Sequence, residues 1–444
     1  MFSYWQKYGS HYRDIAKLSL PIMVAQLGTI VTGYADTMMV GHYSTTALAS
    51  ASFVSNTFNL VIMLSLGFSY GITPLVGALF ARGEKQAAGA TLRVATAANA
   101  LYGALVLVAM TVFYLNLGHI GQPEELLPSI RSYYLLILVS MVPVVFTHVF
   151  RQFADATGHT SLGMWIFTVG NVLNIIGNYV LIYGHFGAPE LGLDGAGWAT
   201  LGARLFMCVA YVVVIACSNR YRPYWEGFKA SKTTAAALKE MFATSFPISV
   251  QMGAETFIFA FTGVVAGWLG AISLAAYQLL VMLGSLGFMI YYAFGAGMAV
   301  KISHYNGLDD HEGVHAAVHA GYVLTLVSAA VASAVFIIFG DFILSLFTAD
   351  RAVVALAVSI LIPLSLYQFG DATQVTFANA LRGIARVKPM MWCALVAYVV
   401  VGTPLIFFLG KASVLGLTGI YIAFFVALLL AGLLFLYYFR KAKR

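Results

Sequence analysis

Four ionisable side chains stand inside long apolar stretches of this sequence, where a charge is costly. Asp36, Glu255 and Asp371 are acids, and Arg204 is a base. At the centre of a bilayer, each charge costs about 2.5–3.5 kcal/mol on insertion scales. A carboxylate there can bind a bare cation through its oxygens, or hold a proton because a low dielectric favours the neutral form. These residue types therefore predict cation chemistry at membrane depth.

Two of the acids have a polar neighbour one helical turn away. Gln251 precedes Glu255 by four residues in "SVQMGAETFIFAFTGVVAG", and Tyr367 precedes Asp371 by four in "LSLYQFGDATQ". In a helix, residues four apart share a face. A pair of acids from two helices can bind both a metal ion and a proton, and the two compete. Glu255 and Asp371 are thus candidate ligands for a cation such as Na⁺.

The first half of the chain carries polar stripes instead. Gln26, Thr29, Gly33 and Asp36 would lie along one helix face, and Asn171, Asn174 and Asn178 along another. If both stripes face inward, they predict a hydrated cavity with one titratable group. Two alternatives stay open. The asparagines could simply join helices, at about 0.6 kcal/mol per bond, and Asp36 could be solvated near the interface. Arg204 could pair with an acid or extend to the membrane surface.

The composition identifies the elements that must position these residues. Of 444 residues, 61% are hydrophobic and 9% charged, and the mean hydropathy is +0.86, whereas soluble domains contain about 25% charged residues. This predicts an all-α polytopic membrane protein. About twelve apolar runs are long enough to be spanning helices, with centres near residues 27, 58, 103, 140, 172, 206, 256, 284, 326, 366, 398 and 426.

The net charge of +7 comes mostly from clusters between the apolar runs, as topology signals do, so we expect no nucleic-acid partner. The clusters fall at both ends of the chain and in the even-numbered loops. By the positive-inside rule, both termini are then cytoplasmic. The three cysteines, Cys208, Cys217 and Cys393, lack metal-like spacing and are expected to be packing residues.

The longest polar connection separates two similar halves. "SLPIMVAQ" matches "SFPISVQM" at a shift of 226 residues, and "FADATGHTSLGMW" recurs loosely as "FANALRGIARVKPMMW". Such parallel repeats are typical of transporters. We predict two pseudo-symmetric six-helix bundles, with an N-terminal bundle over residues 1–218, a cytoplasmic linker over 219–242 and a C-terminal bundle over 243–444.

Over essentially its full length, the chain resembles the multidrug and toxic compound extrusion (MATE) family, in its bacterial NorM-like branch. The matching segments are "YADTMMVGH", "NVLNIIGNYVLIYGHFGAPELGLDGAG", "AET" and "FGDATQVTFANALRG". The resemblance implies a multidrug efflux antiporter of a bacterial inner membrane. It would export amphipathic, mostly cationic organic compounds in exchange for Na⁺ or H⁺, by alternating access, as a monomer among membrane lipids and with no cofactor.

The resemblance also implies roles for individual residues. Glu255, Asp371 and Tyr367 would form the cation-coupling site, and the first bundle would hold a polar cluster comprising Asp36, Asn174, Asn178 and Gln26. Substrate-binding candidates are Asp350, Phe288, Tyr291 and Gln278. Two positions depart from the family pattern. Phe288 stands where relatives can carry a tyrosine, and Asn178 stands where other branches carry an acid for proton coupling, which favours the second bundle as the coupling site.

Two alternative functions remain open at this stage. A flippase for lipid-linked saccharides would need a strongly cationic cavity, but Arg204 is the one base clearly inside a predicted span. A membrane-bound metalloprotease would need a zinc motif, and "HEGVH" at His311, Glu312 and His315 matches HExxH literally. This segment lies in a polar stretch before the ninth run and no third ligand is evident, so we expect a solvated loop rather than a zinc site.

Overall fold

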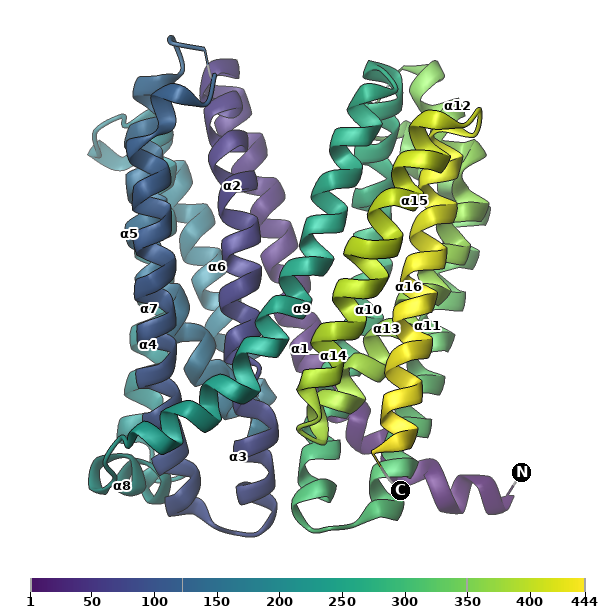
Figure 1. Cartoon of the computed structure of the whole chain (residues 1–444). Coiled ribbons are helices and arrows are strands. Elements are labelled where there is room, and N and C mark those ends of the chain that lie inside the picture. Colours follow the sequence, from purple (N-terminus) through teal and green to yellow (C-terminus); the bar gives the residue numbers. More distant parts are fainter. Residues whose placement is uncertain (1, 122, 349, 443–444) are drawn as a thin grey trace. The chain divides into compact units, whose positions relative to one another are not determined.

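The structure is a computed structural model that describes residues 2–121, 123–348 and 350–442, and these contain helices and no strand. Within them, 11 helices are long and apolar enough to cross a membrane, or 12 if α12 (Arg351–Ser359) and α13 (Leu361–Gly383), which meet at 50°, form one bent span. Each predicted apolar run falls on one of these spans. An all-α polytopic membrane protein is therefore confirmed (Figure 1).

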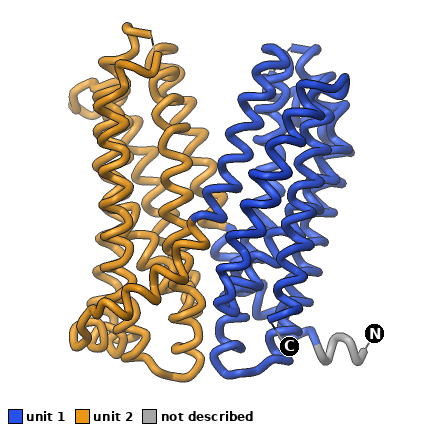
Figure 2. The backbone as a smooth tube through the Cα atoms, viewed as in Figure 1, with its two compact units in different colours: residues 1–23, 250–444 blue, residues 24–249 orange. Residues whose placement is uncertain are grey.

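The chain divides into two compact units, coloured separately in Figure 2. Unit 1 comprises residues 1–23 and 250–444, and unit 2 comprises residues 24–249. Both cuts fall inside a long helix, namely α1 (Phe2–Tyr43) and α9 (Ala235–Trp268). The sequence instead predicts both boundaries in the polar connection, at residues 218 and 243. The contacts differ from this prediction because they assign the beginning of α1 to the unit of the second half, and the beginning of α9 to the unit of the first half.

The two cuts lie at equivalent positions of the sequence repeat. Each follows a proline, Pro21 in α1 and Pro247 in α9, where the helix lacks one backbone hydrogen bond. The serine two residues before each proline packs against a glycine of its unit. A Cβ at Gly297 would lie 2.3 Å from Ser19 Oγ, and one at Gly71 would lie 2.2 Å from Ser245 Oγ. The beginnings of α1 and α9 are therefore packed in the same way, in units 1 and 2 respectively.

Unit 2 holds seven further helices and two short turns of 3₁₀ helix. These elements are α2 (Thr45–Ser69), α3 (Ile72–Ala81), α4 (Lys85–Leu115), η1 (Leu117–His119), α5 (Leu127–Ala156), α6 (Thr160–Tyr183), η2 (His185–Gly187), α7 (Gly192–Cys217) and α8 (Arg222–Ala230). The core contains large, fully buried side chains such as Phe68, Phe153 and Tyr211. Helices α5, α6 and α7 pack on one another, and α5 and α6 carry many of the buried polar residues of this unit, among them Ser140, Asn174 and Asn178.

Helix α8, which lies in the predicted linker, is docked on α4 through two glycines. A Cβ at Gly89 would lie 1.9 Å from the carbonyl oxygen of Tyr224, and one at Gly227 would lie 2.1 Å from that of Gln86. Arg93 Nη1 donates to the carbonyl oxygens of Phe228 and Lys229 at 3.2 Å, which satisfies acceptors at the C-terminus of α8. The region is thus a packed part of unit 2.

Unit 1 contains the remainder of the chain. Besides α12 and α13, its elements are α10 (Ala271–Gly307), α11 (His311–Ser345), α14 (Val387–Ala394), η3 (Leu395–Gly402), α15 (Thr403–Phe407), η4 (Phe408–Ala412) and α16 (Gly416–Lys441). Two of them, η3 and η4, are π-helical. Such segments occur often at functional sites, and η3 brings Tyr398 into the buried interior.

Left-handed backbone positions recur at equivalent points of the two halves. Gly83 before α4 corresponds to Asp309 before α11, with φ values of 77° and 57°. Gly158 before α6 corresponds to Ala385 before α14, with φ values of 76° and 57°. Positive φ values favour glycine, yet Asp309 and Ala385 adopt them at the positions that correspond to Gly83 and Gly158. The conformation of each turn is therefore repeated even where the glycine is not. The structure thus supports the predicted pseudo-symmetry.

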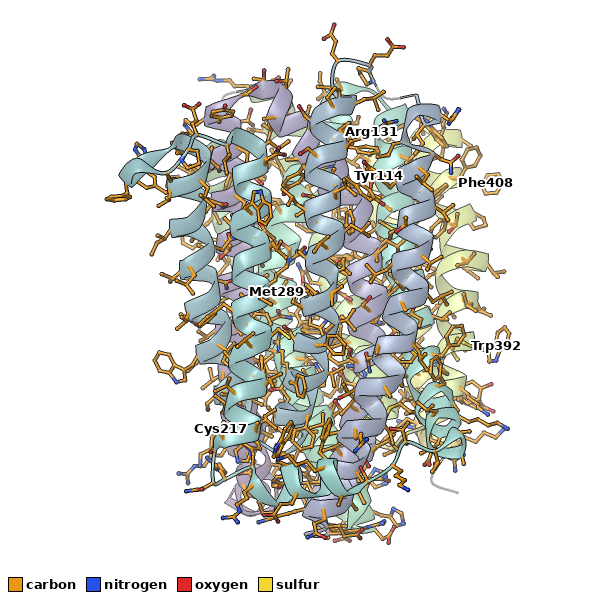
Figure 3. The ribbon with its side chains drawn as sticks, turned by 90° about the vertical axis from the view of Figure 1, so that its left-hand side faces the viewer. Tyr114, Arg131, Cys217, Met289, Trp392 and Phe408 are labelled. Atoms are coloured by element: carbon orange, nitrogen blue, oxygen red, sulfur yellow. The ribbon has the colours of Figure 1, made fainter. Side chains whose placement is uncertain are left out.

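The outward faces of the spans are apolar, as lipid contact requires. On α4, Leu101, Leu105, Val108 and Val112 form a stripe with exposed fractions of 55–66%. Figure 3 shows Trp392 and Phe408 projecting outward from the ribbon, and 63% and 61% of these side chains are exposed. In water such a surface would be unfavourable, whereas in a bilayer it has no cost.

Candidate functional site

Asp371 is held by two phenols in the interior of unit 1. Tyr291 Oη, from α10, donates to Asp371 Oδ2 at 2.5 Å, and Tyr367 Oη donates to the same oxygen at 3.5 Å. Asp371 is 1% exposed. Tyr367 therefore lies beside Asp371 as predicted. Tyr291, which was predicted as a substrate contact, donates a hydrogen bond directly to this acid.

Glu255 is held by two amides from different helices. Gln251 Nε2 donates to Glu255 Oε2 at 2.8 Å, and Gln374 Nε2, from α13, donates to the same oxygen at 3.1 Å. Because Gln374 lies three residues after Asp371, α13 contributes groups to both acids. The two acids therefore belong to one cluster between α9 and α13. The buried Tyr398 is within electrostatic range of both acids.

Several buried oxygens of this cluster have no hydrogen-bond partner among the described residues. They are Asp371 Oδ1 and the side-chain carbonyl oxygens of Gln251 and Gln374. A buried polar atom without a partner costs about 1–3 kcal/mol, and an ion or water bound there would supply the missing partner. Carboxylate, amide and phenol oxygens are hard ligands that suit a small cation. Na⁺ fits this set as a transported ion.

The remaining substrate candidates are distributed over unit 1. Phe288 packs edge-on against Tyr291, with ring centroids 5.7 Å apart, and therefore lies beside the Asp371 cluster. Gln278 is ten residues earlier on α10 and is exposed. Asp350 is the N-cap of α12, where Oδ1 accepts from the backbone N–H groups of Ala352 at 2.9 Å and Val353 at 3.4 Å. Of these four candidates, Tyr291 is bonded directly to Asp371 and Phe288 reaches the acid through Tyr291, within the part of the chain that the structure describes.

The capping role of Asp350 gives a first prediction. Asp350→Ala should destabilise the protein by about 1 kcal/mol, whereas Asp350→Asn should retain most of that stability, because asparagine caps a helix nearly as well as aspartate. Thermal unfolding in detergent measures both. If Asp350→Asn keeps wild-type stability but reduces drug export, the charge acts on the drug. A stability loss in Asp350→Asn equal to that in Asp350→Ala would contradict the capping role.

The polar cluster predicted for the first bundle is assembled in unit 2. Asn178 Nδ2 donates to Asp36 Oδ1 at 2.5 Å and lies 3.4 Å from Asn174 Oδ1, and Asn174 Nδ2 donates to Thr200 Oγ1 at 3.3 Å. The cluster joins α1, α6 and α7. Gln26 is half-buried ten residues before Asp36 on α1, and none of the hydrogen bonds just described reaches it.

Arg204 lies one helical turn after Thr200 on α7. Its Nη1 donates to Ser140 Oγ of α5 at 2.6 Å. Arg204 and Asp36 are within electrostatic range of each other, and Tyr133 is within range of both. Its printed contact is thus with a neutral hydroxyl, and no ion pair joins Arg204 to an acid among the residues that the structure describes.

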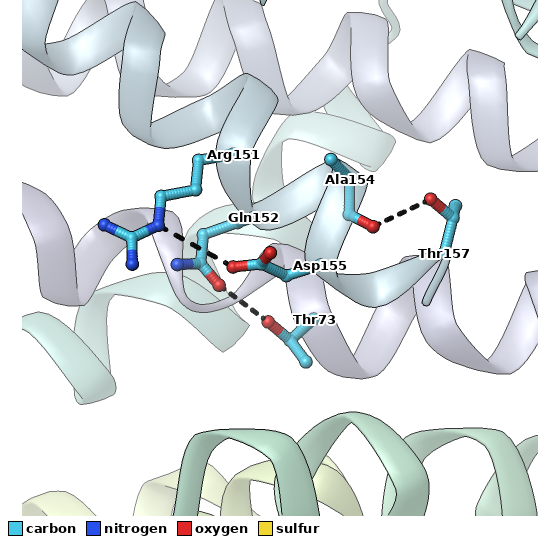
Figure 4. A network of polar contacts seen from close by, with 6 residues as sticks. All are labelled: Thr73, Arg151, Gln152, Ala154, Asp155 and Thr157. Atoms are coloured by element: carbon cyan, nitrogen blue, oxygen red, sulfur yellow. Dashed lines mark hydrogen bonds and ion pairs between the residues drawn. The ribbon is translucent and has the colours of Figure 1, made fainter. Parts of the chain in front are cut away.

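The expectation that Arg204 is the only base inside the spans is wrong. Arg151 and Arg382 are also buried, at 7% and 4% exposure. Arg151 Nε lies 3.8 Å from Asp155 Oδ2 on the same face of α5, as Figure 4 shows, and Thr73 donates to the adjacent Gln152 at 3.1 Å. The i, i+4 spacing of Arg151 and Asp155 in "FRQFAD" was the available signal, but it lies near the end of the apolar run.

The zinc motif does not form a site in the described part of the chain. His311 and Glu312 begin α11, after the N-cap Asp310, and the ring of His315 packs edge-on against Phe439. No group of three or more His, Cys, Asp or Glu side chains among the described residues could hold a metal ion. A third zinc ligand, which the metalloprotease alternative requires, is therefore missing there.

Comparisons with known proteins identify the family. The MatE family model matches residues 21–180 and 247–408. The probable multidrug resistance protein NorM of Geobacillus kaustophilus is 30% identical over 96% of this chain and 93% of its own. The multidrug resistance protein PmpM of Pseudomonas aeruginosa is 29% identical over 90% and 84%.

Solved structures agree at the level of fold. The crystal structure of a eukaryotic MATE transporter superposes with a TM-score of 0.88 over 98% of this chain and 99% of that one, at 16% identity. An outward-facing multidrug resistance MATE transporter also gives 0.88, over 97% and 96%, at 16% identity. The chain accordingly belongs to the MATE family of multidrug efflux transporters, in its NorM-like branch, and is a transporter rather than an enzyme.

Proposed function

We propose that this protein is a cation-coupled antiporter that exports amphipathic, mostly cationic organic compounds in exchange for inward Na⁺ or H⁺. The observation that carries the proposal is the cluster of Glu255 and Asp371 in unit 1, with unpartnered oxygens of Asp371, Gln251 and Gln374 beside it. Two acids so close together repel each other when both are ionised. A cation bound between them relieves that repulsion.

The exchange follows from competition for the two acids. When Na⁺ or H⁺ binds, the cluster loses negative charge and holds a cationic drug less strongly, which favours release of the drug outside. When the ion leaves on the cytoplasmic side, the acids regain their charge and favour the next drug. Alternating access of the two bundles connects the two events. One charge moving through about 100 mV supplies about 2.3 kcal/mol, and no covalent step or cofactor is required.

Aromatic side chains beside the acids suit a flat organic cation. Phe288 stands edge-on to Tyr291, and the ring faces of such residues attract cations by about 0.5–2 kcal/mol. Because Tyr291 also donates to Asp371, a drug that displaces its hydroxyl would alter the ion site directly. Phe288 and Tyr291 are therefore the proposed link between drug and ion, with Gln278 and Asp350 as more remote contacts.

The setting of this activity is part of the proposal. The clusters of basic residues at the even-numbered loops and at both ends of the sequence support cytoplasmic termini, and the NorM and PmpM relatives are bacterial proteins. We therefore propose a bacterial inner membrane as its location, and we expect a monomer surrounded by lipid.

The test uses the purified protein in proteoliposomes loaded with a fluorescent cationic drug. A Na⁺ pulse at constant pH and a proton pulse without Na⁺ are applied separately. Drug movement should follow at least one pulse, and the Glu255→Gln/Asp371→Asn variant should respond to neither. Drug movement that is equally fast without any ion gradient, or in that double variant, would refute the proposal.

A further inference from the structure

The end of unit 2 that carries α8 has an excess of basic side chains. They lie in residues 82–93 and 219–240, whose helices α4 and α8 pack together. The bases are Arg82, Lys85, Arg93, Arg220, Arg222, Lys229, Lys232 and Lys239, and the acids are Glu84, Glu226 and Glu240. All of these except the half-buried Arg93 are exposed. Together they form the basic surface of unit 2, which attracts anions.

Helix α8 presents its charged residues on one face. Tyr224 and Gly227 are buried against α4, whereas Arg222, Glu226 and Lys229 are exposed. Spacings of four and three residues place the exposed side chains together, away from the buried pair. Arg222 Nε and Glu226 Oε1 form an ion pair at 3.0 Å, so the charges of these two residues offset each other. The excess positive charge therefore comes from Lys229 and from the bases outside α8.

Two aromatic side chains lie along the edge of this charged face. The rings of Trp225 and Phe228 are stacked, with centroids 4.9 Å apart and planes 7° from parallel, and both side chains are half-buried. Lys229 Nζ lies 5.7 Å from the ring centroid of Trp225, and the guanidinium carbon of Arg93 lies 5.9 Å from that of Phe228. Tryptophan beside lysine and arginine is typical of segments at the level of lipid headgroups.

The position of α8 along α4 fits the same level. Figure 1 shows α8 at the lower end of unit 2, and it contacts α4 at Gly89. Leu115, at the opposite end of α4, is 70% exposed. From Gly89 to Leu115 the helix is about 39 Å long, or about 37 Å across the membrane at a typical tilt of about 20°. A bilayer is about 40–45 Å thick with headgroups, and its hydrocarbon about 30 Å. With Leu115 at one edge of the hydrocarbon, α8 falls in the opposite headgroup layer.

We propose that the basic surface of unit 2 binds the headgroups of anionic phospholipids, and that α8 lies in the headgroup layer of the membrane. Lysine and arginine donate to phosphate oxygens, and each one near an anionic membrane surface strengthens binding about fivefold. A soluble acidic partner would need the charges, but neither the stacked rings beside them nor the depth of α8, and these two observations favour lipid. The inference does not depend on the proposed transport function.

The test places a fluorophore on α8 and compares the lipids that reach it. Ala230→Cys, at the exposed end of the helix, is labelled in a chain whose 3 cysteines are replaced by alanine, and the protein is reconstituted in phosphatidylcholine bilayers. Anionic phosphatidylglycerol or zwitterionic phosphatidylcholine is added with a nitroxide near its headgroup, which quenches the fluorophore on contact. The anionic lipid should quench at least about fivefold more effectively. In about 0.5 M NaCl most of this preference should disappear, because salt screens exposed charges.

Two triple variants locate the effect. Arg220→Gln/Lys229→Gln/Lys232→Gln removes exposed bases of the basic surface and should lose the preference for the anionic lipid. The matched control removes as many exposed bases from unit 1 and should keep the preference; it is Arg386→Gln/Lys388→Gln/Arg440→Gln. Equal loss in both variants would assign the effect to net charge alone and would overturn the proposal.

Other results also decide. Equal quenching by the two lipids in the wild type refutes the proposal. So does the absence of quenching by either lipid, or stronger quenching by a nitroxide near the end of the acyl chain, because α8 would then lie outside the headgroup layer. If the first triple variant does not fold, a wild-type preference that salt leaves unchanged is sufficient to refute the proposal. Quenching needs neither drug nor ion gradient, so the result is independent of Glu255 and Asp371.

Discussion

Replacing Glu255 by glutamine is expected to abolish most ion-driven drug export. The variant keeps the shape of the side chain and its contacts with Gln251 and Gln374, but it removes one of the two negative charges of the cluster. Hydrogen bonds and contacts to a charged group contribute about 1.5–3 kcal/mol, so the affinity for the coupling cation should fall about ten- to a hundredfold. Export driven by a fixed ion gradient, measured in everted vesicles, should fall accordingly.

A matched control is available on the same helix. Glu240 is exposed near the beginning of α9, and Glu240→Gln should export the drug at the wild-type rate. Expression and monodispersity of both variants are compared first, so that a folding defect is not mistaken for a transport defect. Wild-type export by Glu255→Gln at low Na⁺ and neutral pH would exclude this acid from coupling.

The largest effect on stability is expected at Gly89. A methyl group there would lie 1.9 Å from the carbonyl oxygen of Tyr224 and 3.0 Å from the backbone nitrogen of Phe228. Because both are backbone atoms, neither can rotate away, and α8 must move off α4. Overpacking of this kind costs about 1–3 kcal/mol, occasionally more. Gly89→Ala should therefore lower the thermal unfolding temperature clearly and expose the segment after α7 to limited proteolysis.

The control for this variant is Gly202 on α7, which has open space around the position of its Cβ. Gly202→Ala should be neutral or slightly stabilising, since alanine favours a helix over glycine by up to about 1 kcal/mol. Gly227→Ala, on the other side of the same contact, should resemble Gly89→Ala. The two effects should not add in the double variant, because the first change already separates the helices. Equal melting temperatures of Gly89→Ala and Gly202→Ala would disprove the close packing of α4 and α8.

Most of the fold was predictable because membrane helices are long, apolar and repeated. Every apolar run corresponds to a span, and the match around Pro21 and Pro247 reports a real structural equivalence. What hydropathy could not predict is where a helix changes its packing partners. The cuts inside α1 and α9 depend on which glycine each serine contacts, and those glycines, Gly297 and Gly71, lie far away in the sequence.

The candidate site was partly predictable for a similar reason. Glu255, Asp371 and Tyr367 stand out because polar residues are rare in apolar runs, and the structure brings them together. Gln374 and Tyr398 were missed because an amide or a phenol is common in membrane helices and carries no charge. Arg151 and Asp155 were missed because their positive and negative charges follow closely in sequence, as in a solvated loop, although their pairing allows them to be buried.

The exchange of the first helical segments means that neither half of this chain is a complete folding unit. Residues 1–23 belong to the compact unit formed by the second half, and residues 235–249 belong to that formed by the first. In this respect the molecule resembles two swapped protomers that a duplication has joined in one polypeptide. Fragments separated at the exposed stretch around Lys232 would each lack a segment that only the other supplies. They should therefore be degraded when produced singly and recovered together when produced in the same cell.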